Sequence, residues 1–195
     1  MSDQPNDVLV DSVSYFRLAY CIRPLLRGSF GSAPPYTLHV LSVLDDEFNK
    51  SDRLQHKFGW VGDPAFKNDR AAKRYKIGKK KVEEEVHRTV KYLGRYADEK
   101  ALNVSLEDIK ALAVGFVKSV PVVTDDMNMT EIATAHNIDC WSTIKLLKLM
   151  HSSGKIDDAK VEEIVKHWHQ QKDLPMSLER VREVFKEYFG KDCPI

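Results

Sequence analysis

The chain lacks the features that mark several classes of protein. Its three cysteines are odd in number and widely separated, which excludes a disulfide framework and a zinc-ligand spacing. The strongest apolar runs, such as 112–117, are far too short to cross a bilayer. The polar start MSDQPND has no basic and apolar leader pattern, so we expect no secretory signal. These absences predict a cytoplasmic protein with no membrane partner.

Strong net charge is missing as well. The net charge is +1, with 30% charged and 43% hydrophobic residues, which is ordinary for a soluble globular chain. A length of 195 residues suits one domain with a sizeable core. We therefore predict a single domain over residues 1–195, and the overall charge by itself favours no partner.

Buried strands alternate with helices along the sequence. Short apolar runs at 7–10, 120–124 and 138–141 predict strands. A Gly/Pro/Ser cluster at 27–35 predicts a loop, and 51–68 has no clear periodicity. This alternation predicts an α/β fold with a parallel sheet. The spacing predicts helices at 14–26, 36–49, 69–96, 105–116, 129–136, 142–150, 157–171 and 177–189.

Acidic residues directly follow two of the expected strands. Asp11 ends the run Val8-Leu-Val, and Asp125 with Asp126 follow Val122-Val-Thr. Ligands of open parallel sheets bind outside the carboxyl ends of the strands. Acids gathered there repel one another unless a divalent cation binds, and an all-oxygen ligand set favours Mg²⁺ or Mn²⁺. Each Asp taken alone is equally well explained as a helix N-cap.

Two further acids stand in predicted helices, Glu47 before Phe48 and Asp108 after Ser105. With these acids the sequence resembles the PIN-domain ribonucleases, which include the toxins of bacterial toxin–antitoxin pairs. The opening strand and Asp11-Ser12 are similar to the start of that family, and Glu47-Phe48 to its helical acid. Asp108-Ile-Lys-Ala-Leu-Ala113 and Thr124-Asp125-Asp126 resemble its later motifs. The resemblance covers roughly residues 7–50 and 104–170.

The resemblance implies a fold, a reaction and a site. The fold would be a three-layer α/β/α sandwich with a central parallel sheet, a mainly helical basic insertion at 51–103 and an added C-terminal helical extension at 172–195. The activity would be an endoribonuclease that hydrolyses RNA with Mg²⁺ or Mn²⁺. Asp11 and Asp126 would bind the metal directly, and Glu47 and Asp108 would bind metal or orient the attacking water. Ser12 and Thr124 would support the carboxylates or the phosphate.

Several positions in this pattern stay open. Val13 stands where the family has Asn, and Asp45-Asp46-Glu47 offers three acids for one role. Phe48 favours Glu47, but Asp45 or Asp46 is an alternative. Asp125 competes with Asp126, and the Thr-x-Asp pattern favours Asp126, with Asp125 in a supporting role.

A basic run supplies candidate RNA contacts. Between Lys67 and Lys81 one acid, Asp69, stands among eight cations. Such a run can neutralise phosphates, although the same segregation is common on a solvated helix face. The candidate RNA-binding residues are Lys73, Arg74, Lys76, Lys79, Lys80 and Lys81.

Two further classes of function compete with the nuclease. One is a PIN-like protein-interaction module with little or no nuclease activity. The other is a Mg²⁺-dependent phosphotransfer domain, such as a receiver or a phosphatase. A phosphatase of the haloacid type would have Asp-x-Asp after the first strand, where this chain has Asp11-Ser12-Val13. The toxin resemblance also implies an antitoxin partner and a homodimer. The histidines lack a metal-ligand spacing, and Trp60, Trp141 and Trp168 are most simply core or interface residues.

Overall fold

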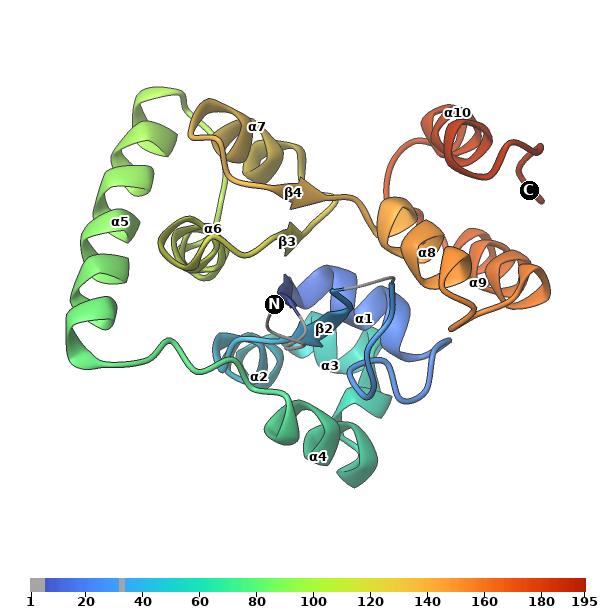
Figure 1. Cartoon of the computed structure of the whole chain (residues 1–195), viewed down its shortest axis with the longest axis horizontal. Helices are drawn as coiled ribbons and strands as arrows, with labels where there is room; N and C mark the ends of the chain where they lie inside the picture. Colours follow the sequence, from blue (N-terminus) through green and yellow to red (C-terminus); the bar gives the residue numbers. More distant parts are fainter. Residues whose placement is uncertain (1–5, 32–33) are drawn as a thin grey trace.

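The structure is a computed structural model that describes residues 6–31 and 34–195. The first five residues of the N-terminus and residues 32–33 of the predicted loop at 27–35 lie outside these ranges. Within them the chain forms a parallel sheet of four strands, in the order β2-β1-β3-β4, and ten α-helices (Figure 1). The predicted α/β fold with a parallel sheet is confirmed. The strands are β1 (Asn6–Val10), β2 (Tyr36–His39), β3 (Val122–Val123) and β4 (Cys140–Trp141).

Helices cover both faces of the sheet, as a three-layer arrangement requires. Val8 and Val10 of β1 point into one apolar core, and Leu9 between them points into the other, because successive strand residues face opposite sides. The first core is completed by α1 (Ser12–Ala19), α8 (Thr143–Ser152), α9 (Asp158–Gln170) and α10 (Leu178–Phe189), and the second by α5 (Lys80–Glu99), α6 (Leu106–Lys118) and α7 (Met127–Ala135). Figure 1 shows these two groups of helices on opposite sides of the strands.

The order of the strands creates a switch point. Strand β1 pairs with β2 on one side and with β3 on the other, through Val8↔Leu38 and Val10↔Val123. The chain therefore leaves β1 toward one face, into α1 (Ser12–Ala19), and leaves β3 toward the other, into α7 (Met127–Ala135). A crevice opens at such a point, outside the carboxyl ends of the strands.

The helices predicted over 36–49 and 14–26 differ from those in the structure. The helix predicted over 36–49 is wrong in its first part, where Tyr36–His39 form β2, and α2 begins only at Val43 (Val43–Lys50). Tyr36 and Thr37 have side chains that favour strands. The helix predicted over 14–26 begins earlier, at Ser12, and ends at Ala19, because Pro24 cannot donate a helical hydrogen bond.

Short helices replace the irregular segment expected at 51–68. They are α3 (Asp52–Lys57), the 3₁₀ turn η1 (Gly59–Gly62) and α4 (Pro64–Ala72). The Ser51 hydroxyl caps α3 by accepting from the N–H of Leu54 at 3.3 Å, and Pro64 opens α4 at a position where its missing N–H costs nothing.

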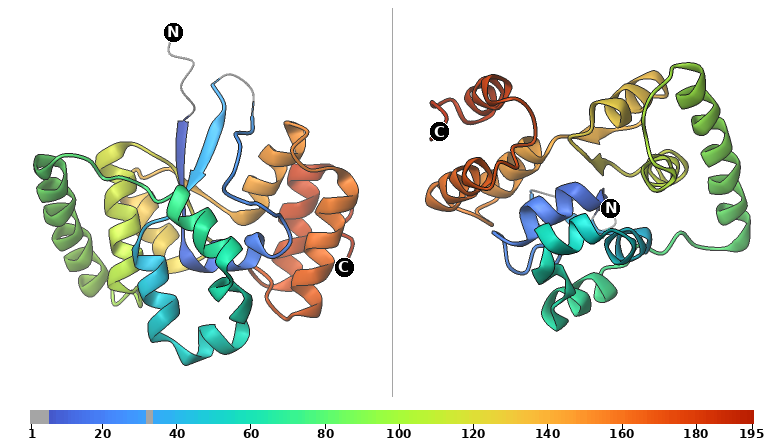
Figure 2. Two further views of the ribbon diagram at one scale, coloured as in Figure 1. Left: turned by 90° about the horizontal axis from the view of Figure 1, so that it is seen from below. Right: turned by 180° about the vertical axis from the view of Figure 1, so that it is seen from behind.

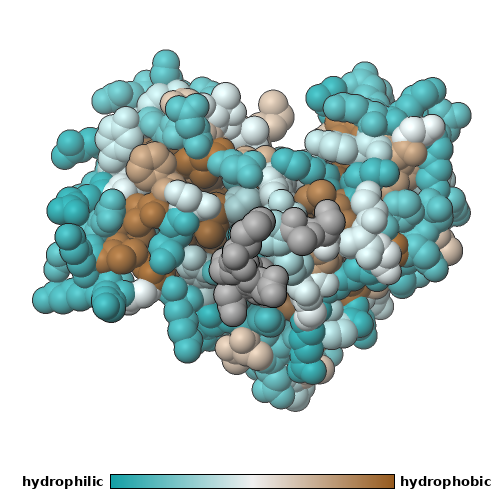
Figure 3. Space-filling view, viewed as in Figure 1, coloured by the Kyte–Doolittle hydropathy of each residue, from teal (hydrophilic) through white to brown (hydrophobic). Residues whose placement is uncertain are grey.

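The helix predicted over 69–96 is interrupted. Its first part belongs to α4, and α5 starts only at Lys80. Gly78 between them has φ +119°, which side-chain-bearing residues rarely adopt. Figure 3 shows hydrophilic side chains over the outer side of α5 and apolar ones gathered where α5 approaches α6, so α5 is amphipathic. None of the helices in the described ranges is both long and apolar enough to span a membrane.

The second half follows the sequence predictions within a few residues. Strands β3 and β4 are shorter than predicted, and Ser105, Asp126, Ser142, Asp157 and Ser177 cap the helices that come after them. Helix α10 packs on α8 and buries Val181 and Phe185 (Figure 2). The helices are α5 (Lys80–Glu99), α6 (Leu106–Lys118), α8 (Thr143–Ser152), α9 (Asp158–Gln170) and α10 (Leu178–Phe189).

Candidate functional site

Asp11 lies at the switch point between β1 and β3. It is 8% exposed, its backbone N–H donates to the carbonyl of Val123 at 3.0 Å, and its Oδ1 caps α1 by accepting from the N–H of Ser14 at 2.6 Å. Burial raises the pKa of Asp11 from 3.8 to about 7. Hydrogen bonds with Thr124 and Ser14 oppose the rise, and the negative charge of Asp125 adds to it.

Glu47 and Asp108 come from helices α2 and α6, which pack together. Burial raises the pKa of both carboxyls, and hydrogen bonds from Ser12 to Glu47 and from Ser105 to Asp108 oppose the rise. The charge of Asp108 raises the pKa of Glu47 further. These two predicted acids are therefore close enough to repel each other.

Asp126 also lies close enough to Asp108 for their charges to interact. Its charge raises the pKa of Asp108, and its Oδ1 caps α7 by accepting from the N–H of Met129 at 2.8 Å. The Thr124 hydroxyl accepts from the N–H of Asp126 at 3.1 Å. Thr124 thus contacts acids that come after both strands.

Asp125 has a different environment from its neighbour. Its side chain is 4% exposed and lies 2.5 Å from Nη1 of Arg17, which is 7% exposed. It also accepts from the N–H and the hydroxyl of Thr143 at 2.9 and 2.7 Å. Burial raises the pKa of Asp125, while Arg17 and Thr143 oppose the rise. Asp125 therefore ties α1 to the start of α8, which leaves Asp126 as the freer acid of the pair.

The three acids of α2, Asp45, Asp46 and Glu47, have different surroundings. Oδ1 of Asp45 lies 2.8 Å from Nη2 of Arg70, and Oδ2 lies 3.2 Å from Nη2 of Arg74. Asp46 is exposed. Glu47 is the one of the three whose pKa is raised by the charge of Asp108.

A narrow crevice at the end of β1 brings Asp11 and Asp108 into one lining. Its volume is about 10 Å³, about the space that one water molecule needs. Glu107 also lines it, and its charge raises the pKa of both Glu47 and Asp108. The remaining lining residues are Leu9, Val10, Ser12, Leu41, Val43, Leu44 and Ala111.

The donor set suits a hard cation in its chemistry. None of the ion pairs found in the described residues involves Asp11, Glu47, Asp108 or Asp126, so hydrogen bonds rather than cations of the chain accompany these carboxyls. Oxygen donors of this kind favour Mg²⁺ or Mn²⁺. In the same part of the chain no three His, Cys, Asp or Glu side chains converge as a ready metal site. Cation binding would therefore draw the side chains closer together.

The six candidate RNA-binding residues of the basic run lie on the connector between α4 and α5 and on the first turn of α5. Arg74 forms a parallel bridge with Val40, directly after β2, and the N–H of Tyr75 donates to the carbonyl of Val40 at 2.9 Å. Lys73 is partly buried, and Lys76, Lys79, Lys80 and Lys81 are exposed. No cation of this run is among the causes that shift the pKa of Asp11, Glu47 or Asp108. Its contact with RNA stays a prediction.

Arg17 and Glu107 are absent from the residues that the sequence predicts for the site. Glu107 directly precedes a predicted site residue, so its proximity was a usable signal. No signal in the sequence indicates Arg17, because its partner Asp125 is 108 residues away along the chain.

Fold and site together define a protein of the α/β class with an acidic crevice at its switch point. Neither the protein-family models nor the curated proteins contain a match to this sequence.

Proposed function

We propose that the chain is a Mg²⁺- or Mn²⁺-dependent endoribonuclease of PIN-like type. The observation that carries this proposal is the crevice at the end of β1, which Asp11 and Asp108 line together, with Glu47 and Asp126 close enough for charge interaction with Asp108. A structural role explains Asp125, which has a full set of partners. It does not explain Glu47 and Asp108, two half-buried carboxyls whose pKa values are raised by burial and by the charges of other acids, since such repulsion costs stability.

Each acid then has a role of its own. Asp11 and Asp126 would hold the cation through the oxygens that are not occupied as helix caps. When bound, the metal lowers the pKa of a water molecule and neutralises charge on the phosphate. Glu47, with its raised pKa, is suited to accept a proton from the attacking water. Asp108 would orient this water or share the metal, and Ser12 and Thr124 hydrogen-bond Glu47 and Asp11 and so hold these carboxyls in place.

A cleavage assay tests the proposal. Purified protein is incubated with end-labelled single-stranded and structured RNAs in Mn²⁺, in Mg²⁺ and in EDTA. We expect cleavage with either metal, none in EDTA, and none in the Asp126→Asn variant, which keeps the helix cap. Cleavage that survives EDTA or Asp126→Asn, or its absence from every RNA, would rule out the assignment.

The choice among the three acids of α2 has its own test. We expect Mn²⁺ to raise the melting temperature of the wild type, since a ligand of the folded state stabilises it by mass action. Glu47→Gln should abolish most of this rise. Asp46→Asn, the matched control on the same helix, should leave it unchanged. An Asp46→Asn variant that loses the rise while Glu47→Gln keeps it would transfer the role to Asp46.

A protein-interaction module is the second candidate, and one observation favours it. Large apolar side chains next to the acids are exposed: Val13 by 44%, Leu106 by 66% and Met127 by 85%. Exposed apolar groups around a functional edge are typical of protein contacts. An antitoxin or a second copy of the chain would use this surface. Without cleavage in the assay above, this second function becomes the leading candidate.

We also infer a reducing compartment, the cytoplasm, for this activity. Cys21, Cys140 and Cys193 are all free. Burial raises the pKa of Cys21 to about 11 and that of Cys140 to about 12. Thiols with raised pKa values stay protonated at neutral pH and are poorly reactive. Free, unreactive thiols are typical of proteins in a reducing compartment.

A further inference from the structure

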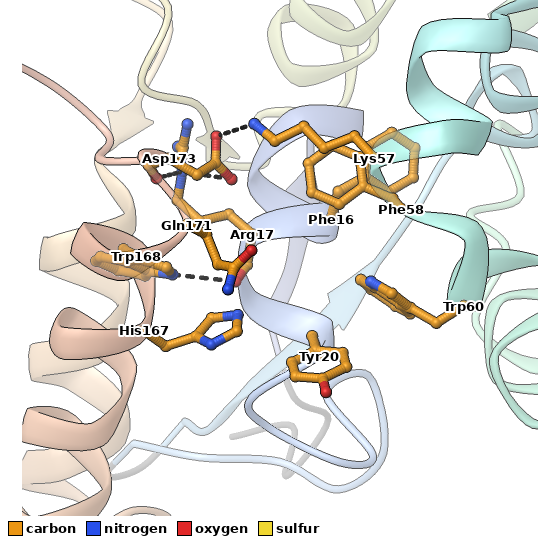
Figure 4. A pocket seen from close by; sticks show the side chains of 10 residues that line it. All are labelled: Phe16, Arg17, Tyr20, Lys57, Phe58, Trp60, His167, Trp168, Gln171 and Asp173. Carbon is orange, nitrogen blue, oxygen red and sulfur yellow. Dashed lines mark hydrogen bonds and ion pairs between the residues drawn. The ribbon is translucent and has the colours of Figure 1, made fainter.

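Two nearly buried arginines hold α1 to its neighbours. Arg17 lines a pocket of about 230 Å³ beside α9, between α1 and the segment of α3 and η1 (Figure 4). Its Nη1 bonds Asp125 and its Nε donates to the carbonyl of Asp173 at 3.0 Å, so it joins α1 to the segments after β3 and α9. Arg70 of α4 is the more deeply buried of the two, at 2% against 7% exposed, and its contacts lead to the helix that carries Glu47.

Every nitrogen of the Arg70 guanidinium has a partner. Nε and Nη2 each lie 2.8 Å from Oδ1 of Asp45 in α2. Nη1 donates to the carbonyl of Val61 in η1 at 3.1 Å and to the hydroxyl of Tyr15 in α1 at 3.5 Å. Arg70 therefore connects α4, which carries it, with α1, α2 and η1.

Stability alone does not account for this arrangement. Charged side chains are almost never fully buried without a partner, and a buried ion pair is often no more stabilising than apolar side chains of the same volume. What such a pair fixes is geometry, because the planar guanidinium donates in fixed directions. The geometry that Arg70 fixes is that of α2.

Helix α2 needs an external contact to set its rotation. It has eight residues and no side-chain cap at Ser42, and so short a helix is marginal on its own. Its buried side chains are Leu44 and Phe48, four positions apart on one line along the helix. A helix that rests on one line of contacts can roll about that line, and the ion pair of Asp45 with Arg70 prevents this roll.

A roll of α2 would move Glu47. Asp45 and Glu47 are two positions apart, which is about 200° around a helix of about 3.6 residues per turn. The two acids therefore lie on opposite flanks of the buried line. Asp45 meets Arg70 on one flank, and Glu47 meets Ser12 and the charge of Asp108 on the other.

Helices α1 and α2 are thus joined twice. Ser12 and Tyr15 are three positions apart and share a face of α1. The first hydrogen-bonds Glu47, and the second reaches Asp45 through the guanidinium of Arg70. Loss of the second connection would leave one hydrogen bond between a hydroxyl and a carboxyl to hold this flank of α2 against α1.

We propose that Arg70 is a positioning residue of the acidic site, which sets the rotation of α2 through Asp45 and so directs Glu47 toward the other acids. The inference rests on the proposed metal-dependent function and adds to it a residue that contacts neither metal nor RNA. It also assigns Asp45, an alternative to Glu47, to the ion pair rather than to the metal. Arg74, which lies 3.2 Å from Oδ2 of Asp45 and is 50% exposed, adds a second contact from the surface.

Mn²⁺ affinity, measured from the electron paramagnetic resonance signal of the free ion, tests this inference. Arg70→Met is the main variant, because Met fills the space with an apolar side chain and leaves Asp45, 31% exposed, with Arg74 as its partner. We expect it to bind Mn²⁺ about 10- to 100-fold more weakly, as after the loss of other residues that orient metal ligands. The matched control is Arg27→Met, which breaks an ion pair with the neighbouring Asp69 at 3.0 Å and does not touch α2; it should bind Mn²⁺ like the wild type.

A double-mutant cycle separates positioning from a general loss of structure. If Arg70 acts through Glu47, Arg70→Met in the Glu47→Gln background should cause little further loss of Mn²⁺ affinity. Arg70→Lys is the second variant, since it keeps the buried charge but loses the planar fork, and its affinity should fall in the same direction. Urea denaturation in EDTA identifies the temperature at which each variant is folded, and the affinities are compared there.

Three results would overturn the inference and leave the nuclease proposal standing. Unchanged Mn²⁺ affinity in Arg70→Met and Arg70→Lys would limit Arg70 to a role in stability. Tighter binding in Arg70→Met would make Asp45 the ligand, since the guanidinium would then have competed with the metal for its oxygens. An equal loss in both Glu47 backgrounds, or in Arg27→Met, would show a general weakening of the fold. A wild-type protein that binds no Mn²⁺ would instead refute the nuclease proposal, and this inference with it.

Discussion

Asp11→Asn will be more stable than the wild type at about pH 8 in EDTA and will not cleave RNA. The wild-type carboxyl is buried, and its pKa rises from 3.8 to about 7 on folding. A shift of this size corresponds to a penalty of up to about 4 kcal/mol for the charged form in the folded state. Asn removes the charge and keeps the cap of α1, so we expect a gain of about 2–4 kcal/mol in the free energy of unfolding.

The pH dependence of this gain comes from linkage. Between about pH 4 and pH 7 the folded protein holds a proton on Asp11 that the unfolded chain has released, so wild-type stability falls as pH rises through this window. Urea denaturation of both proteins across this range should give a difference that is small at the acid end and constant above about pH 7. A variant less stable than the wild type at every pH would mean that Asp11 is satisfied as a charged group. Asp46→Asn, on the exposed side of α2, is the control for loss of one surface charge.

The acids after the strands were predictable because their signal is local. Val8-Leu-Val and Val122-Val-Thr are buried runs, and the residue directly after a buried strand of a parallel sheet lies at the carboxyl edge of that sheet. Phe48, the apolar neighbour by which Glu47 was chosen, is 6% exposed, and the role of Glu47 itself stays a prediction. The pairing of Asp45 with Arg70 was not predictable, since the two are 25 residues apart along the chain.

The missed strand β2 shows where periodicity fails. Leu38, Leu41, Leu44 and Phe48 have helical spacing, yet the first belongs to a strand and the last two to a helix. Leu38 is fixed by its pairing with Val8 across the sheet, a contact between distant residues that no local pattern reveals. The break before α5 is similar, because the connector after α4 pairs with Val40.

The pocket beside α9 was also outside the reach of the sequence. Trp60 and Trp168 were assigned to core or interface, and Trp168, at 1% exposed, is indeed core. Trp60 is only partly buried and lies against Tyr20, 40 positions earlier in the chain, which in turn stacks on His167. Three segments must fold together before these rings form one surface, so spacing alone cannot predict it.

Asp125→Asn and Asp126→Asn will differ sharply although the two residues are neighbours. Asp125→Asn leaves the buried guanidinium of Arg17 without its partner carboxylate, and breaking a buried ion pair on one side costs about 3–5 kcal/mol. Asp126→Asn keeps an N-cap on an exposed residue and should cost less than about 0.5 kcal/mol. Urea denaturation of both variants measures the difference.

A second substitution separates charge from packing in this pair. Arg17→Met in the Asp125→Asn background removes the unpaired buried charge and should recover part of the lost stability, a coupling that a double-mutant cycle measures. Cleavage should take the opposite order: Asp125→Asn, assayed at a temperature where it is folded, keeps metal-dependent cleavage, and Asp126→Asn loses it. If the two variants are equally stable, or if Asp125→Asn is the inactive one, the division between an acid that joins α1 to α8 and an acid that binds metal is wrong. The proposed metal ligand after β3 would then be Asp125, and Arg17 would lie in the active site itself.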